Sequence, residues 1–217
     1  MVNVWGDLVP AFNETLLMVG VSSFFAIAGG LPLGILLYIT ERRLFWENQA
    51  AHRIGSVVVN LIRSLPFVIL LVMLLPFTQW VLGTTIGPAA ASVPLSVAAI
   101  AFYARLVEGA LCEVDPGIIE AAQAFGASPL RIIFGVLVRE ALPGFVRGLT
   151  ITLISLIGYS AMAGIVGGGG IGDLAIRFGY YRYQTDVMVI TVIALVIFVQ
   201  LVQSAGDFLA KRADKKG

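Results

Sequence analysis

Arg63 is the main charge inside an apolar stretch of the sequence, and Ser64 and Pro66 follow it closely. Ionisable residues within a membrane are costly, so they commonly mark a pathway for an ion or a substrate. Pro66 can kink a helix because it lacks a backbone N–H and its ring crowds the preceding turn. We therefore treat these three residues as candidates for a transport pathway or its gate. The alternative is that Arg63, about six residues from one end of its span, only extends its side chain to the membrane surface.

Tyr159, Ser160 and Met162 lie together in a second apolar stretch, among small residues that let helices approach closely. Their groups suit the wall of a pathway, and the Met162 thioether is chemically compatible with a thioether ligand. Plain helix packing is the alternative for all three. They form the second half of the candidate pathway.

Three further sequence patterns resemble functional motifs but do not indicate a functional site. The run Gly167–Gly172 matches G-x-G-x-x-G, but it follows an apolar stretch rather than a strand, so we expect a tight turn instead of a phosphate site. His52 has no partners at metal-ligand spacing, and the sequence carries no H-E-x-x-H or G-x-S-x-G motif. Asn13 begins a glycosylation sequon, a motif short enough to occur by chance. We expect no catalytic residue and no metal site in this chain.

The composition places these residues in a membrane protein. The 217 residues are 59% hydrophobic and only 12% charged, against about 25% charged residues in ordinary soluble domains. The same numbers exclude intrinsic disorder, and the single cysteine, Cys112, excludes a disulfide scaffold. Nucleic-acid binding is disfavoured by a net charge of only +1.

Charge-free stretches predict five membrane-spanning helices, since a span needs about 20 mostly apolar residues. The stretch between Arg63 and Arg105 supplies most of two spans, with a turn-rich break before Pro88. The apolar runs do not alternate with polar residues, as the strands of a membrane β-barrel do. We predict a single all-α integral membrane domain over residues 1–217, with spans at about 15–40, 57–77, 87–108, 148–168 and 187–207.

Basic residues set the expected orientation. Five spans put the two termini on opposite sides, and eleven of the fourteen Lys and Arg fall on the side of the C-terminus. Cytoplasmic loops carry an excess of Lys and Arg. We therefore expect the N-terminus outside and the C-terminus in the cytoplasm. The start of the chain lacks the basic region of a cleavable signal peptide.

The segment between Arg105 and Arg147 differs from the rest of the chain. It holds nine charges in 43 residues and is longer than a simple connection between spans. Asp115–Pro116 is a favourable helix start, Gly126 can end that helix, and Ser128–Pro129 can start another. The segment, about residues 115–143, is therefore predicted to be a cytoplasmic helix-turn-helix.

The second helix of this segment is expected to run from Leu130 to about Leu142 with an apolar face. Leu130, Ile133, Phe134 and Leu137 have the i, i+3, i+4, i+7 spacing of one helix side. Two interpretations stay open on physical grounds. The helix pair either packs against its own spans or docks a cytoplasmic partner.

Glu120-Ala121-Ala122, followed after three residues by Gly126, resembles the EAA motif of ATP-binding-cassette (ABC) importer permeases. In that family the motif lies in the last large cytoplasmic loop, as it does here. The family's Leu-Pro is absent from its expected place, where Val138-Arg139 stands, and Leu142-Pro143 follows four residues later. This departure leaves the path of the second helix open.

The resemblance extends over nearly the whole chain. Asn60–Phe67 resembles the start of the second span in amino-acid importer permeases. Glu140–Gly144 and Gly158–Gly164 resemble permeases of the methionine-uptake type in particular, as do the length and the five spans. The fold implied is that of a type I ABC importer permease.

This resemblance implies a non-catalytic transmembrane subunit in the bacterial cytoplasmic (inner) membrane. Two copies of the chain, surrounded by lipid, would form the pathway for methionine, the L-form with the D-form left open. An external binding protein, a lipoprotein or a periplasmic protein, would deliver the ligand. Two cytoplasmic ATPase subunits would bind ATP and Mg²⁺, so this chain would hold no cofactor.

The resemblance also assigns residues to the contact with the ATPase. Glu120 would make polar contacts, Ala121 and Ala122 would allow close approach, and Gly126 would allow the turn. The complete set is Glu120, Ala121, Ala122, Gly126, Ala127, Ser128 and Pro129.

Other functions stay open at this point. A permease for another amino acid or a small peptide would carry the same motifs, since selectivity can reside largely in the binding protein. A channel would leave the docking segment unexplained, and an intramembrane enzyme would need catalytic motifs that the sequence lacks. Failure to recover an ATPase from detergent extracts would favour one of these two classes.

Overall fold

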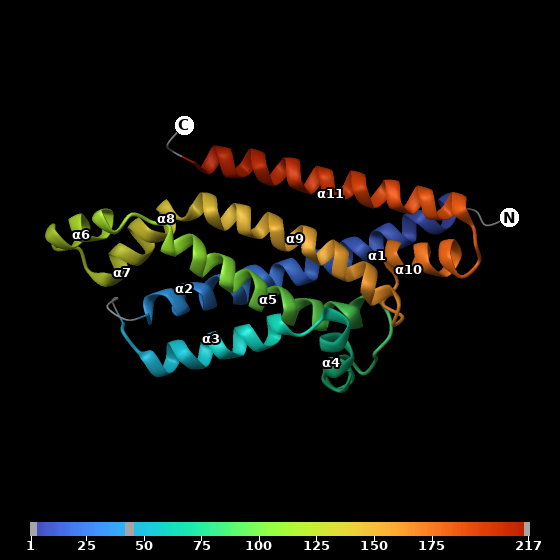
Figure 1. The fold of residues 1–217 in the computed structure, drawn as a ribbon, viewed down its shortest axis with the longest axis horizontal. Helices are drawn as coiled ribbons and strands as arrows, with labels where there is room; N and C mark the ends of the chain where they lie inside the picture. Colours follow the sequence, from blue (N-terminus) through green and yellow to red (C-terminus); the bar gives the residue numbers. More distant parts are fainter. Residues whose placement is uncertain (1–3, 42–45, 215–217) are drawn as a thin grey trace.

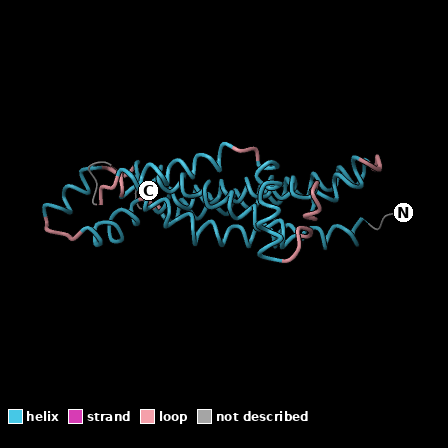
Figure 2. Tube along the Cα trace, turned by 90° about the horizontal axis from the view of Figure 1, so that it is seen from below, coloured by secondary structure: helices cyan, strands magenta, loops and turns pink. Residues whose placement is uncertain are grey.

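The computed structural model describes residues 4–41 and 46–214, and in these ranges every regular element is a helix (Figure 2). The all-α prediction is confirmed. Four helical stretches are long and apolar enough to cross a membrane, and a bent helix pair makes five if it counts as one span. The helices lie roughly along one axis, except α4 (Figure 1).

The first span is longer than expected. α1 (Val4–Phe25), a π-helical turn η1 (Ala26–Gly30) and α2 (Leu31–Ile39) follow one another, and residues 6–39 form one candidate span. The sequence range 15–40 began after Glu14, but the helix continues on both sides of that residue. An acid is tolerated there because its carboxylate has a backbone partner, described below.

The second span is bent sharply. α3 (Gln49–Ser64) and α4 (Phe67–Leu82) meet at an angle of 110° around Leu65 and Pro66. Leu65 is extended, with φ −80° and ψ 131°, as a residue before proline prefers. The predicted range 57–77 therefore crosses a corner and does not correspond to one continuous helix.

α5 (Pro88–Cys112) runs through the middle of the bundle, where it packs against α1, α2, α3, α4 and α9 (Figure 1). Small residues allow this close packing, since buried alanines recur along its length from Ala90 to Ala104. A Cβ at Gly34 of α2 would lie 2.5 Å from the Ala104 carbonyl oxygen. The two backbones thus approach at a point where only glycine fits.

The last two spans flank this centre. α9 (Leu142–Gly164) begins six residues before the predicted range 148–168, and α11 (Thr185–Ala213) exceeds 187–207 at both ends. Between them lie α10 (Gly170–Leu174) and the π-helical η3 (Ala175–Tyr180). α11 packs on α9 and η3 and exposes apolar side chains elsewhere, as a lipid-facing helix does.

The charged segment forms α6 (Pro116–Ala124), α7 (Pro129–Ile132), the π-helical η2 (Ile133–Leu137) and α8 (Val138–Glu140). These short helices project at the end of the bundle where α11 also ends (Figure 1). α10 and the start of α1 lie at the opposite end (Figure 1). One end of the bundle therefore carries α6 to α8, and the other end carries α10 and the start of α1.

Candidate docking segment and transport pathway

α6 begins and ends where the sequence predicts. The Asp115 side chain accepts a hydrogen bond from the Gly117 N–H at 2.8 Å, and Pro116 follows at the first helical position. At the other end, Gly126 adopts φ +74°, and the Ala127 N–H donates to the Ala122 carbonyl at 3.1 Å. This is a Schellman-type end, which favours glycine because a Cβ is strained at positive φ.

The second helix of the segment departs from the prediction. It starts after Ser128, whose backbone oxygen accepts the Ile132 N–H at 3.0 Å but whose hydroxyl makes no capping bond. It then widens into the π-helix η2, and α8 ends at Glu140, with a bend at Ala141 before α9. The expected run to Leu142 is thus slightly too long, since Leu142 already belongs to the next span.

The predicted apolar face is split in two. Ile133 and Leu137 are buried against the bundle, whereas Leu130 and Phe134 are 53% and 62% exposed. The four residues were predicted to share one apolar face, with its cover left open, and the bundle covers only the ridge through Ile133 and Leu137. The neighbouring i, i+4 ridge through Leu130 and Phe134 points away from it.

The turn before this ridge exposes a further large apolar side chain. Phe125, next to Gly126 in the turn, is 92% exposed. Together with Leu130 and Phe134 it offers large apolar side chains that the described part of the chain does not cover. Glu120 is exposed on the same short helix pair. We call Glu120, Phe125, Leu130 and Phe134 the docking surface.

Arg63 and Tyr159, predicted separately, line one cavity of about 110 Å³ at the inside of the α3–α4 corner. The Arg63 guanidinium carbon lies 5.9 Å from the centre of the Phe102 ring. The Tyr159 ring stacks on Phe67 with 4.7 Å between ring centres. Phe67 and Phe102 were missed from the sequence, since a single aromatic in an apolar helix carries no positional signal.

The other predicted pathway residues lie elsewhere. Ser64 and Pro66 stand at the corner, where the Ser64 hydroxyl donates to a backbone carbonyl one turn earlier at 2.7 Å. Ser160 is buried and donates to a carbonyl of its own helix at 2.8 Å. Met162 is 43% exposed and does not line the cavity. The cavity therefore unites two of the six residues.

Known proteins resemble the chain over nearly its full length. A family model described as "Binding-protein-dependent transport system inner membrane component" matches residues 30–216. The chain belongs to this family. The helical permease fold is thus that of an inner-membrane transport component.

Individual relatives narrow this assignment. The permease is 43% identical to the "Methionine import system permease protein MetP" of Bacillus subtilis, over 97% of this chain and 96% of the relative. It is 54% identical to the "D-methionine transport system permease protein MetI" of Salmonella typhimurium, over 72% of each chain. A solved structure of inward facing conformations of the MetNI methionine ABC transporter matches with a TM-score of 0.96, 47% identity and coverage of 99% and 100%.

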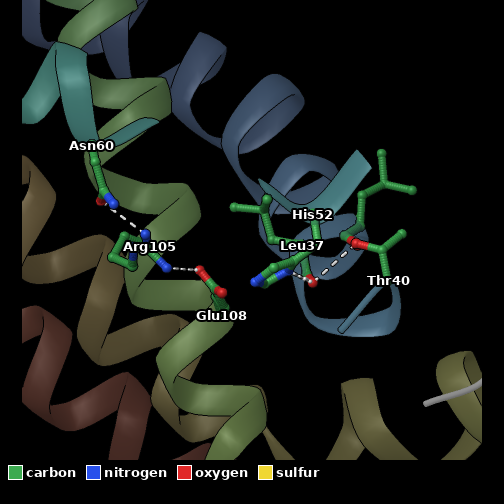
Figure 3. A network of polar contacts seen from close by, with 7 residues as sticks. Leu37, Thr40, His52, Asn60, Arg105 and Glu108 are labelled. Carbon is green, nitrogen blue, oxygen red and sulfur yellow. Dashed lines mark hydrogen bonds and ion pairs between the residues drawn. The ribbon is translucent and has the colours of Figure 1, made fainter. Parts of the chain in front are cut away.

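A polar network joins two spans of the permease near its docking end (Figure 3). Arg105 in α5 pairs with the Glu108 carboxylate at 2.5 Å and donates to the Asn60 side-chain oxygen of α3 at 2.8 Å. Glu108 is buried, and Arg105 is its ion-pair partner. The network holds α3 against α5 on the same face as the cavity.

His52 belongs to a second contact of α3 (Figure 3). Its Nδ1 lies 3.0 Å from the Leu37 carbonyl oxygen, so this nitrogen carries the proton and donates. The Thr40 hydroxyl donates to the same carbonyl at 3.2 Å. Among the residues described, no group of three or more metal-ligating side chains occurs. His52 ties α3 to α2 instead.

The glycine-rich turn lies at the other end of the permease. The Gly170 N–H donates to the Glu14 carboxylate at 2.7 Å, and the Ile171 N–H donates to the Thr15 hydroxyl at 3.0 Å. A Cβ at Gly169 would collide with the Glu14 carboxylate. Amide groups that could hold a phosphate are thus occupied by α1, in agreement with the predicted structural turn.

Asp173 follows this turn in α10 and is partly buried. Its carboxylate pairs with Arg177 at 3.0 Å. Burial raises the pKa of Asp173 most, the nearby Glu14 charge raises it further, and Arg177 opposes both. The ion pair links α10 to η3, whereas the like charge of Glu14 in α1 opposes that of Asp173.

Proposed function

We propose that this permease is the membrane-spanning subunit of an ATP-driven importer for methionine. The names of the relatives from Bacillus subtilis and Salmonella typhimurium and the MetNI methionine ABC transporter structure support the substrate. The docking surface is the structural observation that supports the proposal. It leaves large apolar side chains exposed at one end of a bundle that otherwise suits a membrane.

Two cytoplasmic ATPase subunits bind two copies of the permease at this surface. Phe125, Leu130 and Phe134 fill an apolar cleft of the ATPase, Glu120 supplies a polar contact at its rim, and Gly126 keeps the turn narrow. Ala121 and Ala122 allow close approach, with Ala127 to Pro129 completing the turn. ATP and Mg²⁺ are bound by the ATPases, so the permease is non-catalytic and holds no cofactor.

The docking end faces the cytoplasm of a bacterial cell, and the end with α10 faces outward. Eleven of the fourteen Lys and Arg support this orientation, since they lie on the docking side by sequence position. The N-terminus is then external and the C-terminus cytoplasmic. An external binding protein, a lipoprotein or a periplasmic protein, delivers the ligand to the outer end.

Reconstitution in proteoliposomes tests this function. The permease is combined with its copurifying ATPase and with its binding protein, and uptake of radiolabelled L-methionine is measured with ATP inside the vesicles. Uptake is expected to require ATP and the binding protein and to be inhibited by unlabelled L-methionine. Parallel inhibition by D-methionine shows whether both forms are carried. Equal competition by amino acids without sulfur would contradict the methionine assignment and favour a permease for other amino acids or small peptides.

A further inference from the structure

The cavity at the α3–α4 corner lies deep along α3. Arg63 stands fourteen residues after Gln49, where the helix begins, which is about 21 Å along the axis. The sequence placed this arginine about six residues into a span, within reach of the cytoplasmic surface. α3 begins earlier than that predicted span, and the exposed Arg63 side chain lies among the residues that line the cavity.

The two polar groups at the cavity have no hydrogen-bond or ion-pair partner among the described residues. None of the ion pairs or hydrogen bonds within residues 4–41 and 46–214 involves the Arg63 guanidinium, whose only ring contact is with Phe102. The Tyr159 hydroxyl makes no hydrogen bond to the described residues either, although its ring is held by Phe67. Arg63 is exposed and Tyr159 is partly exposed, so both groups are accessible to a ligand that enters the cavity.

The other residues that line the cavity indicate which chemical group of a ligand fits there. The described lining residues are aliphatic or aromatic apart from Arg63, and none of them is acidic. The cavity therefore offers a counter-charge for an anion and none for an ammonium group. A guanidinium forms two parallel hydrogen bonds with a carboxylate, and aromatic rings make favourable contacts with thioether sulfur.

We propose that this cavity is a carboxylate subsite on the transport pathway, which binds an amino acid with an apolar or thioether side chain. Arg63 pairs with the α-carboxylate, the Tyr159 hydroxyl donates to it, and Phe67 and Phe102 contact the apolar side chain. Pockets that enclose a whole small molecule measure roughly 300–1,000 Å³. The smaller cavity here, about 110 Å³, holds the carboxylate end and the first side-chain atoms.

This proposal rests on the proposed function and adds a specific chemical requirement. The carboxylate of the ligand is essential at this subsite, whereas the amino group is dispensable because no acidic side chain receives it. N-acetyl-L-methionine keeps the carboxylate and lacks the ammonium charge. L-methioninamide keeps the ammonium group and lacks the carboxylate.

The test uses the full permease–ATPase complex in lipid nanodiscs, without binding protein. Equilibrium binding of radiolabelled L-methionine is measured up to millimolar concentration, followed by competition with the two analogues. N-acetyl-L-methionine is expected to compete and L-methioninamide is not. Equal competition by both analogues, or no saturable methionine binding, would overturn the subsite.

Variants locate the binding in the cavity. Arg63→Gln is expected to weaken methionine binding about tenfold or more, and Arg63→Lys to recover part of it, because lysine keeps the charge but loses the planar fork. Arg53→Gln, an exposed arginine of the same helix, serves as the matched control and leaves binding unchanged. Size-exclusion profiles establish that each variant is assembled. Wild-type affinity in a well-assembled Arg63→Gln complex refutes the role of Arg63.

Parallel uptake measurements separate this proposal from the proposed function. If the wild-type complex imports methionine but Arg63→Gln binds and imports it normally, the subsite alone is wrong. If the wild-type complex with its binding protein imports no methionine, the proposed function itself is wrong.

Discussion

Glu14 illustrates how one residue can be both costly and useful in a membrane helix. It lies within the first span, yet its carboxylate accepts the Gly170 N–H, and the adjacent Thr15 accepts the next amide. A carboxylate at the N-terminal amides of a helix is favourable, because these amides have no partner within the helix. The pair therefore joins α1 to the glycine-rich turn, 156 residues away in sequence.

Removal of this carboxylate should loosen the outer end. Glu14→Ala is expected to lower the stability of the detergent-solubilised permease by about 1–3 kcal/mol, since a charged hydrogen bond is lost and an amide is left unpaired. Glu14→Gln keeps an acceptor oxygen and should lose less. Thermal unfolding followed by tryptophan fluorescence measures the difference, with Asn13→Ala as an exposed control. Equal midpoints for Glu14→Ala and Asn13→Ala would contradict this role.

The pair Arg105 and Glu108 provides a second test at the residue scale. Arg105→Met leaves the buried Glu108 charge without its partner, which costs roughly 3–5 kcal/mol for a buried ion pair. The double variant Arg105→Met with Glu108→Met removes both charges and is expected to be more stable than the single variant. Chemical denaturation in detergent measures both. A double variant that is less stable than Arg105→Met would show that the charges do not depend on each other.

At the scale of elements, the sequence predicted where helices end better than it predicted which helices contact each other. Asp115–Pro116 and Gly126 were recognised because capping and positive φ act within a few residues. Pro66 was recognised as a kink, but its 110° corner and the cavity inside it depend on packing against α5 and α9. The contact of Asn60 with Arg105 spans 45 residues and leaves no local pattern.

The exposed ridge of the docking segment shows the same limit. Spacing alone predicted that Leu130 and Phe134 share a face with Ile133 and Leu137. Which of the two ridges is buried depends on where the bundle lies, and this is a tertiary property. The division into two ridges is informative, because the apolar side chains left exposed are those that a partner can cover.

At the scale of the whole molecule, the two ends should be accessible from opposite sides of the membrane. Thr84 lies in the turn between α4 and α5, at the end with the glycine-rich turn, and Glu113 follows α5 at the end with α6. Single cysteines at these positions, with Cys112→Ser as background, are treated with a membrane-impermeant maleimide. Thr84→Cys is expected to react in intact cells and Glu113→Cys only after permeabilisation. The reverse pattern would invert the proposed orientation.

In the proposed assembly, free energy from ATP hydrolysis must also pass from the ATPases to the spans through the small docking surface. Reversal of a conformational preference from 1:99 to 99:1 requires about 5.5 kcal/mol of differential binding. We infer that the docking surface transmits this energy from the ATPases to the spans, as a rigid-body movement of α6 and the helices after it. Gly126 is critical, since a side chain at φ +74° strains the turn that presents Phe125.

The most direct test of this account is the coupling of ATP hydrolysis to methionine uptake in a Gly126→Asp complex. The variant is expected to insert and to leave ATP hydrolysis running while binding-protein-dependent uptake is lost. Gly135→Asp adds the same charge to the same segment at a position without positive φ, and should retain uptake. Normal methionine uptake per ATP hydrolysed by the Gly126→Asp complex would contradict the docking role of this segment.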